Sequence, residues 1–125
     1  MRALVTFAMA GIILLGTSGC AQQQAPARES IIGQWVQKND ATTMLDFAAD
    51  ESFTGNDGCN SLHGSWSEKE RVITLENTAM TLMACQGVDT WLSMAHTVEI
   101  AGDQLTITNA QGQEIGVLTP GENTK

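Results

Sequence analysis

From residue 31 onwards, apolar residues occur in short runs that are rich in β-branched and aromatic side chains. Polar turns with Gly, Asn or Asp separate these runs, an arrangement typical of β-strands. The pattern predicts strands over residues 31–36, 43–48, 52–55, 62–67, 71–75, 104–108 and 114–118. The last two strands are expected to form a hairpin across the turn at residues 109–113.

One segment between these runs has a different spacing. Trp91, Leu92 and Ala95 recur at helical intervals, and Asp89 is a suitable N-cap. The sequence therefore predicts a helix over residues 89–96, which is too short to persist unless it packs on the sheet. The expected fold class is α+β and β-dominated, with a curved antiparallel sheet or partly open barrel packed on one short helix.

The first residues of the chain have the layout of a secretory signal. Arg2 is followed by a thirteen-residue apolar run and then by small residues up to Cys20. The run is too short to cross a bilayer, which takes about 20 apolar residues. A cysteine at this position resembles a bacterial lipobox, which implies removal of residues 1–19 and diacylation of Cys20. Because Ala21 follows where Asp would retain the protein in the inner membrane, the resemblance implies an outer-membrane anchor on the periplasmic face.

Composition divides the remainder into a tether, one domain and a tail. Residues 20–30 are rich in Gln and Ala and lack apolar periodicity, so we expect a lipidated cysteine and a flexible tether there. Residues 31–118 are expected to form the domain and residues 119–125 a C-terminal tail. The 125-residue chain has a net charge of −8, and loss of Arg2 leaves five basic residues against 14 acidic ones, or −9. Such a surface repels nucleic acid and anionic headgroups, so membrane contact is expected only through the lipid.

Export also changes how the cysteines are interpreted. An oxidising periplasm favours disulfides, and once Cys20 carries lipid, Cys59 and Cys85 are the obvious pair. A structural disulfide is the favoured interpretation, and a redox-active pair and a reduced buried pair stay open. The pair lacks Cys-x-x-Cys spacing, but Cys85 precedes the predicted helix, whose N-terminus would stabilise a thiolate.

Other combinations of residues give weaker signals. Cys59, His63, Cys85 and His96 do not have the spacing of a common zinc site, so no metal or other cofactor is expected. The serines and histidines follow no catalytic triad order, so no catalytic residue is expected either. Three methionines are interpreted as core filling in preference to a binding surface. They are Met80, Met83 and Met94.

Two segments carry a more specific signal: GCNSLHGSW at residues 58–66 and AMTLMAC at residues 79–85. In this order they resemble the META domain, whose best-known bacterial members are the HslJ-type heat-shock lipoproteins. The matching positions are Gly58, Cys59, Asn60, Gly64, Trp66, Thr81, Met83 and Cys85. The resemblance implies a fold and an envelope setting, and it carries over no catalytic residue. It also implies that the second segment lies beside the first and brings Cys85 near Cys59.

The expected function is a non-enzymatic binding or structural role in the bacterial cell envelope, with an unidentified envelope protein as partner. The resemblance implies a link to heat shock, envelope stress and drug tolerance. Two alternatives are open. The first is a periplasmic inhibitor of a lytic or proteolytic enzyme, such as lysozyme, whose basic surface would suit an acidic chain. The second is a thiol-redox protein that uses Cys59 and Cys85.

Overall fold

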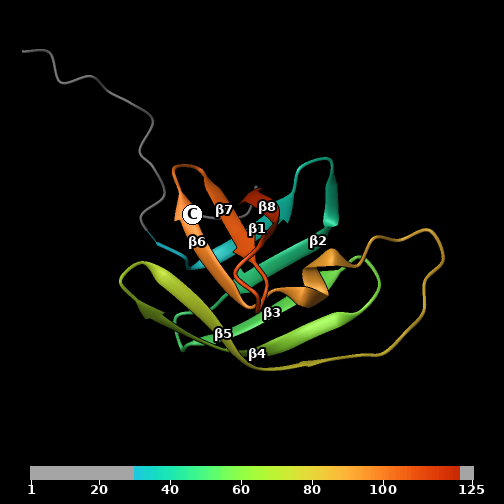
Figure 1. Ribbon diagram of the computed structural model, residues 1–125, viewed down its shortest axis with the longest axis horizontal. Helices are drawn as coiled ribbons and strands as arrows, with labels where there is room; N and C mark the ends of the chain where they lie inside the picture. Colours follow the sequence, from blue (N-terminus) through green and yellow to red (C-terminus); the bar gives the residue numbers. More distant parts are fainter. Residues whose placement is uncertain (1–29, 122–125) are drawn as a thin grey trace, which may run out of the picture.

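Buried and exposed side chains alternate along the strands of the computed structural model, which describes residues 30–121. Thr43, Leu45 and Phe47, for example, face the interior while their neighbours do not. The strands are β1 (Gly33–Gln37), β2 (Asp40–Phe47), β3 (Ser52–Asp57), β4 (Ser61–Lys69), β5 (Val72–Met80), β6 (Thr97–Ala101), β7 (Gln104–Thr108) and β8 (Glu114–Pro120). They form a closed antiparallel barrel in sequence order (Figure 1).

The barrel closes where β8 returns to β1. Trp35 pairs with Pro120 and Val36 with Thr119, and the Gly121 N–H donates to the Gln34 carbonyl at 2.8 Å. The expectation of a curved or partly open sheet is therefore replaced by full closure. Closure has a physical advantage, because it leaves no long unpaired strand edge.

The barrel interior is predominantly apolar. The buried hydrophobic side chains are Ile31, Trp35, Leu45, Phe47, Phe53, Leu62, Ile73, Leu75, Leu92, Val98, Leu105, Ile107 and Leu118. Trp35 is fully buried, and its indole N–H donates to the Ile31 carbonyl at 2.9 Å. The largest core side chain therefore satisfies its polar atom within the segment that leads into β1.

The predicted helix over residues 89–96 is wrong. The structure has only the short 3₁₀ turn η1 (Trp91–Met94), and residues 30–121 contain no α-helix. Ala95 is already extended, the His96 N–H donates to the Thr108 carbonyl at 2.8 Å, and the His96 carbonyl accepts from the Leu75 N–H at 2.9 Å. The backbone N–H and carbonyl of His96 are thus bonded to the sheet at the position where the helix would have continued. Leu92 is nevertheless buried, as the apolar spacing predicts.

The remaining differences lengthen the sheet. β6 was not predicted, although Val98 and Ile100 alternate with polar residues, and it pairs with both β5 and β7. β5 continues to Met80 instead of ending at residue 75, and β8 continues to Pro120. The fold class is therefore all-β, and not α+β as the sequence predicted.

No helix in the described part of the chain is long and apolar enough to cross a bilayer. The expected signal peptide, Cys20 and residues 21–29 of the expected tether lie outside the described residues, as do residues 122–125.

Candidate functional site

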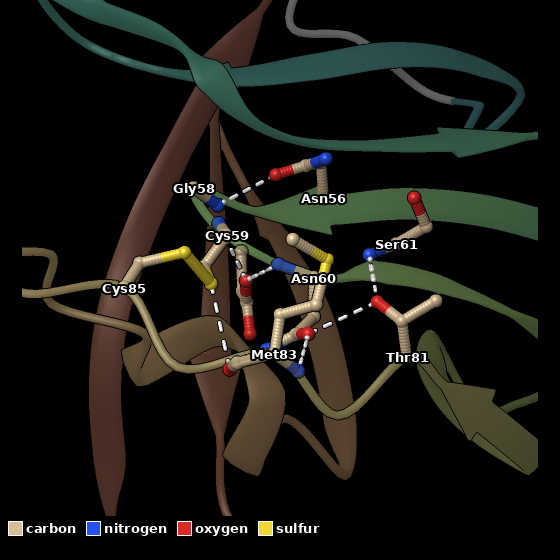
Figure 2. The surroundings of a disulfide bond; sticks show 9 residues. Asn56, Gly58, Cys59, Asn60, Ser61, Thr81, Met83 and Cys85 are labelled. Atoms are coloured by element: carbon tan, nitrogen blue, oxygen red, sulfur yellow. Dashed lines mark hydrogen bonds between the residues drawn. A yellow bond between two sulfur atoms is a disulfide. The ribbon is translucent and has the colours of Figure 1, made fainter.

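The two motif segments meet at one end of the barrel. The first contributes the turn between β3 and β4. The second contributes residues 81–85 of the connection between β5 and η1, which spans residues 81–90 and is here called the β5–η1 loop. Cys59 and Cys85 form a disulfide between them, with their Cα atoms 5.9 Å apart (Figure 2). The predicted pairing of the two cysteines is thus confirmed.

Side-chain oxygens hold the β3–β4 turn in shape. Asp57 Oδ1 accepts hydrogen bonds from the backbone N–H groups of Cys59 at 2.9 Å and Asn60 at 2.5 Å. Asn56 Oδ1 accepts from the Gly58 N–H at 2.7 Å, and Gly58 has a φ of 94°, which favours glycine. The sequence predicted the turn but not the role of Asp57, which is fully buried. The signal was present, because Asn and Asp side chains commonly bond the backbone two residues on.

Asn60 connects this turn to the β5–η1 loop. Its carboxamide pairs with both backbone groups of Met83: Oδ1 accepts from the Met83 N–H at 2.6 Å, and Nδ2 donates to the Met83 carbonyl at 3.3 Å. Figure 2 shows this side chain lying between the two segments. Asn60 is 8% exposed, so its amide is largely removed from water. A side chain with both a donor and an acceptor is required to make this pair.

Thr81 extends the same network. Its hydroxyl donates to Asn60 Oδ1 at 3.0 Å and accepts from the Ser61 N–H at 3.1 Å. The Thr81 N–H in turn donates to the Ser61 carbonyl at 3.1 Å. Gly58, Cys59, Asn60, Thr81, Met83 and Cys85 therefore form one cluster, in which a disulfide and hydrogen bonds fasten the loop to the turn.

Gly64 and Trp66 lie apart from this cluster, along β4. A Cβ on Gly64 would lie 2.6 Å from the Glu76 carbonyl oxygen and 2.9 Å from the Phe53 ring, so the site has no space for a side chain. The register between β4 and β5 shifts at this point. The Trp66 indole N–H donates to the carbonyls of Ala48 and Ser52 at 3.1 and 3.0 Å. Both residues thus stabilise the packing of the barrel and take no part in the cluster.

The loop that the cluster fastens carries apolar side chains on its outer surface. Leu82 is 91% exposed and Met83 63%, and Val88 is also exposed. Met94 in η1 is 62% exposed, whereas Met80 packs against the core. The interpretation of the methionines as core filling is therefore wrong for Met83 and Met94. Figure 1 shows the β5–η1 loop extending beyond the strands before it returns to η1.

The structure also bears on the chemistry of the cysteines. The helix that would have stabilised a Cys85 thiolate is absent from residues 30–121, and η1 begins only at Trp91. Cys59 and Cys85, the two sulfur residues of the possible zinc site, are joined to each other by the disulfide. Within the described residues, no group of three or more His, Cys, Asp or Glu side chains is placed to hold a metal ion.

Comparison with known proteins agrees with the motifs. The profile of the META domain matches residues 20–121, which is well over half of the chain. Searches of curated proteins and of solved structures found no match. The family is thus supported by both motif segments and by a match that spans the whole barrel, and we conclude that the chain belongs to the META domain family.

Proposed function

We propose that the protein is a non-enzymatic binding module of the bacterial envelope, which presents the β5–η1 loop to a partner protein. The observation that carries the proposal is the combination of firm attachment and exposure in this loop. Met83 is held through its backbone by Asn60, and its neighbour Leu82 is 91% exposed. Apolar side chains that are held in a fixed position and exposed to solvent are typical of a surface that binds another protein.

The energetics favour a protein partner. Burial of apolar surface contributes about 25 cal/mol per Å², so covering the Leu82 and Met83 side chains would contribute to affinity. Binding normally loses free energy when a mobile loop is ordered. The disulfide and the Asn60 hydrogen bonds order the loop during folding, before a partner binds. Binding therefore loses less free energy to ordering of the loop.

The same contacts favour binding over catalysis. The polar motif side chains of Asn60 and Thr81 are engaged with the backbone of the two segments that they join. Cys59 and Cys85 are joined to each other. In this arrangement the family motif supports the loop, so the surface of the loop, and not the motif itself, is the functional element.

A second part of the proposal concerns location. We propose that Cys20 carries the lipid anchor and that residues 20–30 tether the barrel at the periplasmic face of the outer membrane, where it acts in envelope stress. The support is the lipobox resemblance, together with a disulfide of the kind that an oxidising compartment favours. Intact mass of the protein purified from membranes should show acyl mass on a chain that begins at Cys20. A full-length or unacylated chain would contradict the anchor.

Photo-cross-linking tests the binding role. A photoreactive amino acid at Leu82 in cells should give a discrete cross-linked product with one envelope protein. The matched control is the same amino acid at Gln111, which is exposed in the turn between β7 and β8. A product at position 82 that is absent at position 111 supports the proposal. Identical patterns at both positions, or no product at position 82, would contradict it.

A further inference from the structure

A small cleft opens beside the β5–η1 loop. It has a volume of about 240 Å³ and lies between the β1–β2 turn, the β3–β4 turn and the start of η1. Its lining includes Gln37, Asp40, Gly58, Val88, Asp89 and Trp91. Pockets that enclose drug-sized ligands measure about 300–1,000 Å³, so this cleft suits a single long side chain better than a free small molecule.

The cleft is negatively charged. Asp40 and Asp89 lie on two different segments, and no Lys or Arg is among the lining residues. Neither carboxylate has an ion-pair partner within residues 30–121. Hydrogen bonds from the Thr42 hydroxyl and then from the Thr42 backbone N–H hold the pKa of Asp40 below its usual value, so this carboxyl stays ionised at neutral pH.

An aromatic side chain forms another wall of the cleft. The Trp91 indole N–H donates to Gln37 Oε1 at 3.0 Å. The ring also rests directly against the β8 backbone at Gly116, where an added Cβ would collide with Trp91 Cζ3. Trp91 is thereby fixed at two points. A fixed tryptophan near carboxylates matches a guanidinium, which stacks on aromatic rings and bonds carboxylate oxygens.

We propose that this cleft receives an arginine side chain of the partner protein that covers the β5–η1 loop. The inference rests on the proposed function, and it specifies the partner's chemistry as a basic surface with an arginine beside apolar residues. Charge complementarity selects the cation, and the exposed Val88 side chain offers a contact for the arginine methylenes. Because Gly87, Val88 and Asp89 belong to the loop, one partner can contact the loop and the cleft together.

The test uses the full-length protein in detergent and the peptide acetyl-Ala-Leu-Arg-Leu-Ala-amide at low ionic strength. The matched control peptide carries citrulline, a neutral isostere, in place of arginine. Each of the three tryptophans gives its own indole N–H signal in an NMR spectrum. The arginine peptide should shift the Trp91 signal in a saturable way, at least tenfold more tightly than the citrulline peptide. The signals of Trp35 and Trp66, which bond backbone carbonyls elsewhere, should stay in place.

Variants of the carboxylates complete the test. Asp89→Asn should remove the preference for arginine over citrulline, whereas Asp103→Asn, in the exposed turn between β6 and β7, should leave it unchanged. Equal shifts with both peptides, no saturable shift of Trp91, or an unchanged preference in Asp89→Asn would overturn the inference. These failures are separate from failure of the proposed function, because cross-linking at Leu82 does not depend on the cleft.

Discussion

Replacing both Cys59 and Cys85 by serine is expected to lower the free energy of unfolding by about 3.5 kcal/mol. The two residues are separated by 26 positions, and a disulfide that closes a loop of this length restricts the unfolded chain by about that amount in the chain-entropy model. A small domain has only about 5–15 kcal/mol of stability in total, so the change would be large. The variant should still fold, because the apolar barrel core is untouched.

Chemical denaturation checks this prediction. The oxidised wild-type protein, the same protein with reductant, and the double variant should be compared at one pH and salt concentration. The reduced wild-type protein and the variant should have matching midpoints, both well below that of the oxidised protein. A loss of less than about 1 kcal/mol would show that the bridge does not stabilise the fold, and it would strengthen the thiol-redox alternative.

Asn60→Ala is expected to lower the free energy of unfolding by about 3 kcal/mol. The substitution removes three hydrogen bonds, two to Met83 and one to Thr81, and each contributes about 1 kcal/mol. The loss falls on the contact between the turn and the β5–η1 loop. We therefore expect the loop to become mobile while the barrel is retained.

A control in the same loop makes this result specific. Gln86 is exposed, and no hydrogen bond involves it within residues 30–121, so Gln86→Ala should stay within about 0.5 kcal/mol of the wild type. Denaturation curves measure both variants. Equal stability of Asn60→Ala and Gln86→Ala would show that the carboxamide is not what holds the loop.

The two effects should not add, because both contacts fasten the same loop. The change in the free energy of unfolding caused by Asn60→Ala is expected to differ between the protein without the disulfide and the oxidised protein. The double-mutant comparison therefore measures how far Cys59–Cys85 and Asn60 act as one unit.

The strands were predictable because their signal is local. β7 coincides with its predicted range, and the other predicted strands differ from their ranges mainly at their ends, although β6 was not predicted. Barrel closure was not predictable from such patterns, since pairing of Trp35 with Pro120 joins opposite ends of the domain. The prediction of a helix was wrong for a related reason. Trp91 and Leu92 do pack against the barrel core as the spacing predicts, but backbone hydrogen bonds that join His96 to Thr108 and Leu75 end the turn.

The motif cluster was predictable only in part. The pairing of Cys59 with Cys85 followed from export and from counting cysteines, and the turn followed from its Asn, Asp and Gly residues. The bonds between Asn60 and Met83 span 23 positions, and no local pattern indicates them. The exposure of Leu82 was also not predictable, because the identity of an apolar residue does not indicate whether it faces the core or solvent.

The central claim is that the family motif fixes the β5–η1 loop, and hydrogen exchange at single amides tests it most directly. The Met83 N–H is bonded to Asn60 Oδ1 at 2.6 Å, whereas the adjacent Leu82 N–H has no partner within residues 30–121. The Met83 amide should therefore exchange about 100-fold or more slowly than the Leu82 amide in the oxidised protein. Exchange of Met83 as fast as that of Leu82 would contradict the account, because the loop would then be unattached.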